Sequence, residues 1–254
     1  MRRLNVPAIV FGLLLLGAWE LAARAGQNSF FPPFSTVLAA LWANGGVIAA
    51  QIVDTLRRAA IGLAIAVAVM VPFGALIGRV RFLGDIFEPL VNMLRPIPPP
   101  AVAPIALLFA GTGDAGKIAM IVYTCAFPIL IGAIDGVRAN HPMLTNVGRS
   151  LRLSRLEIMA FIDLPAAMPI IMTGIRLAVA AALLVSVIAE MLLTTNGVGV
   201  YLLRSQENFR IADGLAGVVA IAVVGFVVND LFLRLDRRLL AWHYATTGGA
   251  EGQG

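Results

Sequence analysis

Six long apolar stretches constrain the fold of this chain more than any other feature of its sequence. A helix needs about 20 mostly apolar residues to cross a bilayer, and there it satisfies its own backbone hydrogen bonds. Only 13% of the residues are charged, whereas soluble domains carry about 25%. The sequence therefore predicts an all-α integral membrane protein. Its predicted spans lie near Val6–Ala23, Ala59–Gly78, Leu90–Ala110, Lys117–Val137, Ile170–Leu193 and Gly214–Leu233.

The first apolar stretch is predicted to be a retained span rather than a signal peptide, because no small-x-small cleavage site ends its long apolar run. Residues 1–58 would form this span and an extracytoplasmic loop, residues 59–240 the core transmembrane domain, and residues 241–254 a flexible tail. Arginine and lysine favour loops on the cytoplasmic side. This bias places both termini and the loop 138–169 in the cytoplasm, although Arg57 and Arg58 oppose it.

Five prolines interrupt the third apolar stretch. Proline removes a backbone hydrogen bond, and at membrane depth the freed carbonyls must face protein or water. We therefore expect a broken helix that either lines a translocation pathway or packs within the protein. Pro96, Pro98 and Phe109 are candidate pathway residues. The five prolines are Pro96, Pro98, Pro99, Pro100 and Pro104.

Glu190 lies within the fifth apolar stretch. An ionisable residue is costly there and often faces a cavity or a partner. Glu190 is therefore a further candidate pathway residue, unless it is solvated near the outer interface or paired with Arg204. Asp114 and Lys117 flank a predicted outer turn, and we interpret them as topology and capping residues.

The remaining polar residues exclude several classes of chemistry. His141 and His243 are too isolated to form a metal site, and Cys125 has no second cysteine for a disulfide. The arginines are spread over loops, which is not the pattern of a nucleic-acid patch. No G-x-x-x-x-G-K-[ST] motif is present, so the chain cannot supply ATP chemistry itself. We therefore do not expect an enzyme.

Two short helices are predicted in the outer loops. In the first loop, Ser35 or Thr36 would cap a helix through Trp42 that ends at Gly45-Gly46. It would lie at the membrane surface or pack on the first span. In the last outer loop, glycines permit tight turns around a helix near Val200–Gln206.

The loop 138–169 interrupts the apolar pattern and contains two further helix signals. Pro142 suits a first helical turn with Asn140 or His141 as cap, which predicts a helix over about Pro142–Leu151. Ser154 followed by Glu157 matches a capping box and predicts a second helix over about Arg155–Ile162. Leu164-Pro165 would end this helix.

Arginines on one side and apolar residues on the other allow two interpretations of this helix pair. It is either a surface hairpin with arginines on lipid phosphates or a docking element for a cytoplasmic partner. The loop resembles the conserved cytoplasmic loop of ABC importer permeases, whose pattern is E-A-A, three residues, G, then I-x-L-P. Together with LRPIPPP, AEML and NGVGVYLL, it resembles the nitrate/sulfonate/taurine subgroup of binding-protein-dependent permeases. The pattern falls on Asn146-Val147-Gly148, Arg152 and Ile162-Asp163-Leu164-Pro165.

This resemblance implies a type I ABC importer permease fold in the bacterial cytoplasmic membrane. It implies a second permease copy, two cytoplasmic ATPase subunits that bind ATP and magnesium, and an extracytoplasmic solute-binding protein. The solute would be sulfonate-, taurine- or nitrate-like, or a related organic anion or pyrimidine precursor. The loop would couple the permease to the ATPase through Asn146, Val147, Gly148, Arg149, Leu151, Arg152, Ser154, Arg155, Leu156, Glu157, Leu164 and Pro165.

Two residues depart from the family pattern. Asn146 replaces the acidic residue and Arg152 replaces the glycine. If Arg152 adopts the left-handed turn conformation, the lost glycine costs about 1 kcal/mol. The alternatives to an ABC permease are a stand-alone secondary transporter or channel, which needs its own coupling-ion site, and an intramembrane enzyme, which needs facing catalytic residues.

Overall fold

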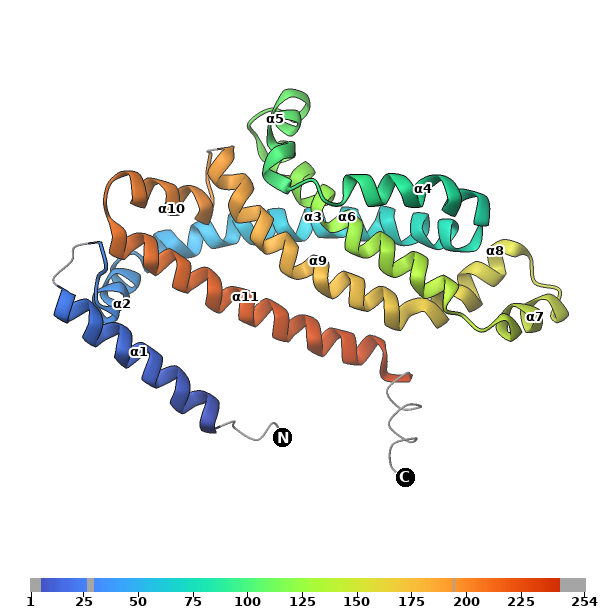
Figure 1. Cartoon of the computed structure of the whole chain (residues 1–254), viewed down its shortest axis with the longest axis horizontal. Coiled ribbons are helices and arrows are strands. Elements are labelled where there is room, and N and C mark those ends of the chain that lie inside the picture. The colour runs from blue at the N-terminus through green and yellow to red at the C-terminus, as the bar shows by residue number, and fades with distance from the viewer. Residues whose placement is uncertain (1–5, 27–29, 194, 243–254) are drawn as a thin grey trace.

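The computed structural model describes residues 6–26, 30–193 and 195–242, and those residues form helices and connecting turns without a β-strand (Figure 1). The predicted C-terminal tail lies mostly outside the described residues. The elements are α1 (Val6–Gly26), α2 (Phe34–Ala43), α3 (Gly45–Arg79), α4 (Arg81–Leu94), α5 (Pro99–Ala110), α6 (Asp114–Arg138), α7 (Pro142–Ser150), α8 (Arg155–Ile158), the π-helical turn η1 (Met159–Asp163), α9 (Leu164–Leu192), α10 (Val198–Glu207) and α11 (Ile211–Leu239).

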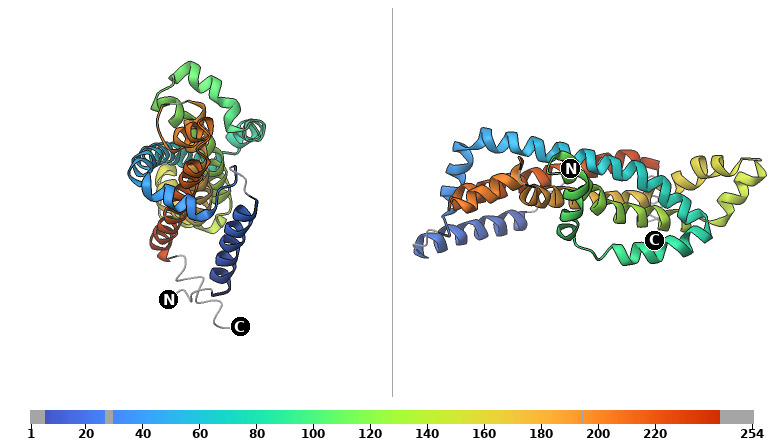
Figure 2. Two further views of the ribbon diagram at one scale, coloured as in Figure 1. Left: turned by 90° about the vertical axis from the view of Figure 1, so that its left-hand side faces the viewer. Right: turned by 90° about the horizontal axis from the view of Figure 1, so that it is seen from above.

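Helices α3, α6 and α9 pack along one another and form the core of the bundle (Figures 1 and 2). Small residues let their backbones approach closely. A Cβ atom on Gly174 of α9 would lie 2.4 Å from the carbonyl oxygen of Pro128 in α6, and one on Gly74 of α3 would lie 2.6 Å from Ala133 Cβ. The sequence therefore sets these contacts through glycine and alanine.

By length and composition, four helical segments of the described chain could cross a membrane, and a bent pair gives a fifth. Helix α1 covers the first predicted span but is not among these segments, so the predicted count of six is not confirmed. The four segments are Gly45–Arg79, Asp114–Arg138, Arg155–Leu192 and Ile211–Leu239.

The second span begins earlier than predicted. Helix α3 starts at Gly45 rather than near Ala59, because the polar residues before Ala59 pair with other elements, as described below. The predicted cap of α2 is also wrong, since Pro33 precedes the helix and no side chain caps it. Ser35 instead hydrogen-bonds to Glu20 of α1 through its backbone N–H and its hydroxyl. The second outer helix is confirmed as α10.

The predicted break in the third apolar stretch is confirmed. Helices α4 and α5 meet at an angle of 102°, and α5 extends away from the bundle (Figure 1). Tyr123 of α6 donates its hydroxyl to the carbonyl of Leu94 at 3.0 Å and contacts that of Ile97 at 3.4 Å. Protein thus satisfies carbonyls that the prolines leave free, as irregular backbone at membrane depth requires.

The predicted end of the second loop helix at Leu164-Pro165 is wrong. Helix α8 continues through η1 into α9, so that Arg155–Leu192 is one helical segment. A π-helical turn shifts the hydrogen-bond register of a helix. Pro165 follows this turn within the first two positions of α9, where a missing N–H is tolerated. The loop is therefore joined rigidly to the span that follows it.

Candidate functional site

The two helices of the loop 138–169 carry the predicted caps. His141 Nδ1 accepts the N–H of Met143 at 3.2 Å and caps α7. The Ser154 hydroxyl accepts the N–H of Glu157 at 3.3 Å, and the Glu157 carboxylate accepts the N–H of Ser154 at 2.7 Å. The capping box is confirmed, and it begins α8 directly after the turn.

Arg152 occupies a left-handed position in that turn, with φ = 57°. The N–H of Leu153 bonds to the carbonyl of Gly148 at 3.1 Å, and that of Arg152 bonds to Arg149 at 3.0 Å. These two bonds form a Schellman motif, in which glycine usually takes the left-handed position. Arg152 therefore occupies a position that glycine would adopt without strain. The turn nevertheless forms with both of its hydrogen bonds.

Gly148 lets α7 pack on the start of the following helix. A Cβ atom there would lie 2.7 Å from Ile162 Cδ1 and 3.0 Å from Ile158 Cγ1. Gly148 is buried and Leu164 is half-buried, whereas the other predicted coupling residues are exposed. The exposed face combines Leu151, 67% exposed, and Leu156, 80% exposed, with arginines.

A basic and an acidic residue join the loop to the end of α3. Arg79 lies 2.8 Å from the Asp163 carboxylate, which is 1% exposed, and donates to the Thr145 hydroxyl at 3.1 Å. The Asn140 side chain donates to the carbonyl of Asp163 at 2.8 Å. The charge bias and apolar pattern of the sequence do not predict this pair. The position of Asp163 between the apolar residues Ile162 and Leu164 is the sequence signal that indicates a buried carboxylate in need of a cationic partner.

A groove of about 670 Å³ lies between the α4–α5 break, α6 and α9. Pro96 and Pro98 are exposed at the break beside it, but neither lines it. Phe109 lies at the far end of α5 and is 84% exposed, and Glu190 is also outside the groove lining. The charged residues of the lining are Arg95 and Asp135, and neither forms an ion pair within the described chain.

Glu190 is fully buried and holds the segment before α10 in place. Its carboxylate accepts hydrogen bonds from Arg58 Nη1 at 2.9 Å, from the Thr55 hydroxyl at 3.0 Å and from the N–H of Gly199 at 3.0 Å. The pairing considered with Arg204 is therefore wrong. Gly197 has φ = 114°, and a Cβ atom there would lie 2.1 Å from Glu190 Cδ. The glycines of N-G-V-G thus make room for Glu190.

The ion pairs around Glu190 extend across three helices. Arg58 also binds Asp114 at 2.6 Å, and Arg57 binds Asp114 at 2.5 Å. Lys117 is fully buried and donates to the Thr195 hydroxyl. The interpretation of Lys117 as a topology or capping residue is therefore wrong, whereas Asp114 lies half-buried in the first turn of α6 and pairs with α3. Their partners come from α3 and from the loop before α10, which the apolar pattern does not reveal.

The chain matches a family model described as the inner membrane component of binding-protein-dependent transport systems, over residues 70–241. The chain is a binding-protein-dependent ABC permease. The permease is 30% identical over 240 residues to the taurine transport system permease protein TauC of Escherichia coli (strain K12), with coverage of 91% of this chain and 87% of that protein. It is 32% identical over 250 residues to the nitrate import permease protein NrtB of Synechococcus elongatus, with coverage of 93% and 88%.

A third relative is the putative aliphatic sulfonates transport permease protein SsuC of Bacillus subtilis (strain 168), which is 27% identical over 252 residues, with coverage of 98% of this chain and 90% of that protein. These relatives confirm the nitrate/sulfonate/taurine subgroup. The fold is similar to a chain of the inward-facing MetNI methionine ABC transporter, with a TM-score of 0.65 and 15% identity. That match covers 78% of the permease and 98% of the other chain. The permease therefore has the predicted type I ABC importer fold.

No group of three or more His, Cys, Asp or Glu side chains in the described part of the permease could hold a metal ion, and His243 lies outside that part. Two exposed features of the described permease bear directly on transport. One is the helix pair α7–α8, and the other is the groove beside the α4–α5 break.

Proposed function

We propose that this permease moves a small solute inward across the bacterial cytoplasmic membrane, driven by two cytoplasmic ATPase subunits that dock on α7 and α8. The main support for docking is the chemistry of the exposed face of this helix pair. Leu151 and Leu156 are largely exposed beside Arg149, Arg152 and Arg155. Apolar anchors with arginine at their rim suit insertion into a groove of a partner.

The continuity of α8 with α9 supports the transmission of force from the ATPase to the groove. Gly148 packs α7 on Ile158 and Ile162, so the helix pair moves as one unit. This unit continues through η1 into α9, which lines the groove with Ile170, Thr173 and Leu177. Closure of an ATPase dimer would displace the loop and tilt α9 against α6, a rigid-body change between two states.

A second permease copy would complete the pathway. The groove is bordered by the α4–α5 break, α6 and α9 of one chain and is open on its remaining side. Closed two-fold dimers are the commonest oligomers, and each copy would contribute one groove. With α7 and α8 in the cytoplasm, α10 lies at the extracytoplasmic end of the bundle (Figure 1), where a solute-binding protein would deliver its cargo.

The charges of the groove favour an anionic or zwitterionic solute. Arg95 and Asp135 both line it without an ion pair among the described residues. An aminosulfonate such as taurine would pair its sulfonate with Arg95 and its ammonium group with Asp135, whereas nitrate or an alkanesulfonate would use Arg95 alone. The relatives named for taurine, nitrate and aliphatic sulfonates support this class.

Reconstitution in proteoliposomes tests this function. The permease would be combined with its ATPase and solute-binding protein, and uptake of taurine, nitrate and an alkanesulfonate would be measured with and without ATP. We expect uptake to require ATP, Arg95→Gln to reduce uptake of every transported solute, and Asp135→Asn to reduce only zwitterion uptake. Uptake by the permease alone would instead support a stand-alone transporter or channel.

A further inference from the structure

Three cavities lie in a row along α4 and α6. The groove beside the α4–α5 break shares Arg95, Ile131 and Asp135 with a smaller cavity of about 170 Å³. This middle cavity shares Glu88 and Arg138 with a third cavity of about 450 Å³ near the end of α3. The row therefore leads from the groove toward the end of the bundle that carries α7 and α8 (Figure 1).

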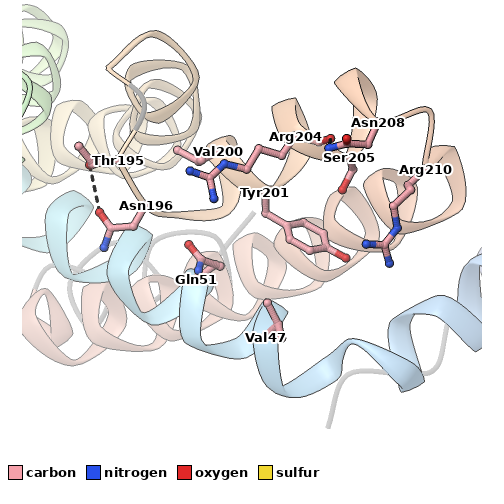
Figure 3. A pocket seen from close by; sticks show the side chains of 10 residues that line it. All are labelled: Val47, Gln51, Thr195, Asn196, Val200, Tyr201, Arg204, Ser205, Asn208 and Arg210. Carbon is pink, nitrogen blue, oxygen red and sulfur yellow. Dashed lines mark hydrogen bonds between the residues drawn. The ribbon is translucent and has the colours of Figure 1, made fainter.

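A further cavity, of about 300 Å³, lies beside α10 at the opposite end of the bundle (Figure 3). It shares no lining residue with the three cavities of the row. It is therefore not part of the row, which extends from the groove in the direction of α7 and α8.

The residues of α4 that line the row form one polar stripe, because they recur at the spacing of a single helix face. The other two faces of the helix are apolar. The polar stripe consists of Asp85, Glu88, Asn92 and Arg95. The face that packs on α3 and α6 contains Leu83, Phe87 and Val91. The exposed apolar face contains Phe82, Ile86 and Met93.

The polar stripe extends to membrane depth. Helices α4 and α5 are together apolar enough to form one bent span. A helix rises about 1.5 Å per residue, so the stripe from Asp85 to Arg95 spans about 15 Å, or half of a hydrocarbon core of about 30 Å. Charged side chains at such a depth face a cavity or a partner, whereas an exposed apolar face can contact lipid. The stripe therefore borders a water-filled space.

Glu88 of α4 and Arg138, the last residue of α6, form an ion pair in the smallest of the three cavities. Gly84 makes room for this pair, because a Cβ atom there would lie 2.5 Å from Arg138 Nη2. Both side chains are about 40% exposed. An ion pair with this exposure shifts an equilibrium by no more than about fivefold, so it can open and close readily.

We propose that the polar stripe of α4 and the end of α6 line the cytoplasmic exit of the solute, and that the Glu88–Arg138 ion pair is the gate of this exit. The direction of movement rests on the proposed function. A solute released from Arg95 and Asp135 in the groove would pass Asn92 and then the ion pair. The exit carries charges of both signs, so it would not retain an ion of either sign, and a conduction path requires such weak binding.

Cysteine labelling tests the exit without an ATPase or a solute. Cys125 is buried and is the single cysteine of the sequence, so Cys125→Ala provides the background for introduced cysteines. Inside-out membrane vesicles that contain the permease alone would be treated with a membrane-impermeant methanethiosulfonate reagent. We expect Asn92→Cys to react at least about tenfold faster than Met93→Cys, because the reactive thiolate forms in water and not on the apolar face. Met93 is the matched control, since it is the next residue of α4 and is 73% exposed.

The gate is tested by the labelling rate of Asn92→Cys in further variants. Glu88→Gln should raise this rate about threefold to fivefold, and the exchange of both charges in Glu88→Arg with Arg138→Glu should restore it. Gly84→Ala displaces the Arg138 guanidinium group without changing a charge and should also raise the rate. Asp85→Cys lies on the cytoplasmic side of the pair, and its labelling rate should be the same in all these variants.

Equal labelling rates of Asn92→Cys and Met93→Cys would overturn the exit. A rate for Asn92→Cys that neither Glu88→Gln nor Gly84→Ala changes would overturn the gate. Because the vesicles contain the permease alone, the expected labelling together with a lack of ATP-driven uptake would support the exit and contradict the proposed function.

Discussion

Arg79, the last residue of α3, lies 2.8 Å from the buried carboxylate of Asp163, in the π-helical turn that joins α8 to α9. The same guanidinium group donates to Thr145 of α7 at 3.1 Å. One side chain thus connects the end of a core span to α7 and to the π-helical turn η1. A displacement of the loop would therefore reach α3 through Arg79 as well as α9 through the continuous helix.

This connection predicts that Arg79→Gln will uncouple ATP hydrolysis from transport. Asp163 would keep a buried carboxylate without its cation, which costs about 3 kcal/mol of folding free energy when a buried pair is broken. In proteoliposomes we expect the ATPase to assemble and hydrolyse ATP, but solute uptake per ATP hydrolysed to fall several-fold. Arg81→Gln, two residues further along, is the control, because Arg81 makes no ion pair among the described residues. An unchanged ratio in Arg79→Gln would show that α9 alone transmits the motion.

The exposed leucines of the loop predict a second result. Leu151→Asp or Leu156→Asp should abolish co-purification of the ATPase, because each puts a charge into an apolar contact, while the permease still inserts into the membrane. The measurement is the ratio of ATPase to permease after affinity purification. Phe209→Asp makes the same kind of change at an exposed aromatic residue beyond α10 and should leave this ratio unaltered. Normal ATPase recovery with both leucine variants would rule out docking through this face.

The conformation of Arg152 predicts a stabilising substitution. Because its φ of 57° is costly for a residue with a Cβ atom, Arg152→Gly should raise the free energy of unfolding by about 1 kcal/mol. Arg149→Gly removes a neighbouring arginine from the last turn of α7, where the backbone is helical, and should instead lower the free energy of unfolding by up to about 1 kcal/mol. Denaturant unfolding of the purified permease would measure both. If Arg152→Gly is destabilising, the arginine side chain contributes contacts that outweigh the strain.

The close approach of Gly197 to Glu190 predicts a severe defect. Gly197→Ala would impose backbone strain of about 1–3 kcal/mol and would also displace the Glu190 carboxylate from Arg58. We expect a low yield of monodisperse permease by size-exclusion chromatography. Gly46→Ala is the control, because nothing lies within 4 Å of a Cβ atom there. A normal yield of Gly197→Ala would mean that the loop before α10 can rearrange freely.

Local sequence signals predicted the elements whose causes are local. The capping box at Ser154 and Glu157, the cap at His141 and the helix break at Pro96–Pro98 each depend on residues within a few positions, and each is confirmed. The predicted end of a helix at Leu164-Pro165 is wrong. A proline stops a helix only when the backbone cannot change its hydrogen-bond register, and the π-helical turn before Pro165 allows that change.

The apolar stretches by themselves determined that this chain is a multi-span membrane protein, and local cap signals determined the two helices of the loop 138–169. The resemblance of that loop and of LRPIPPP, AEML and NGVGVYLL indicated an ABC permease. The tertiary structure alone decided the partners of the charged residues. Arg58, Lys117 and Glu190 looked like boundary or pathway residues, yet they are buried together, because a charge in a low-dielectric interior is stable only beside an opposite charge. The choice of that partner depends on which helices pack side by side, and residues 132 positions apart, such as Arg58 and Glu190, meet only in the folded chain.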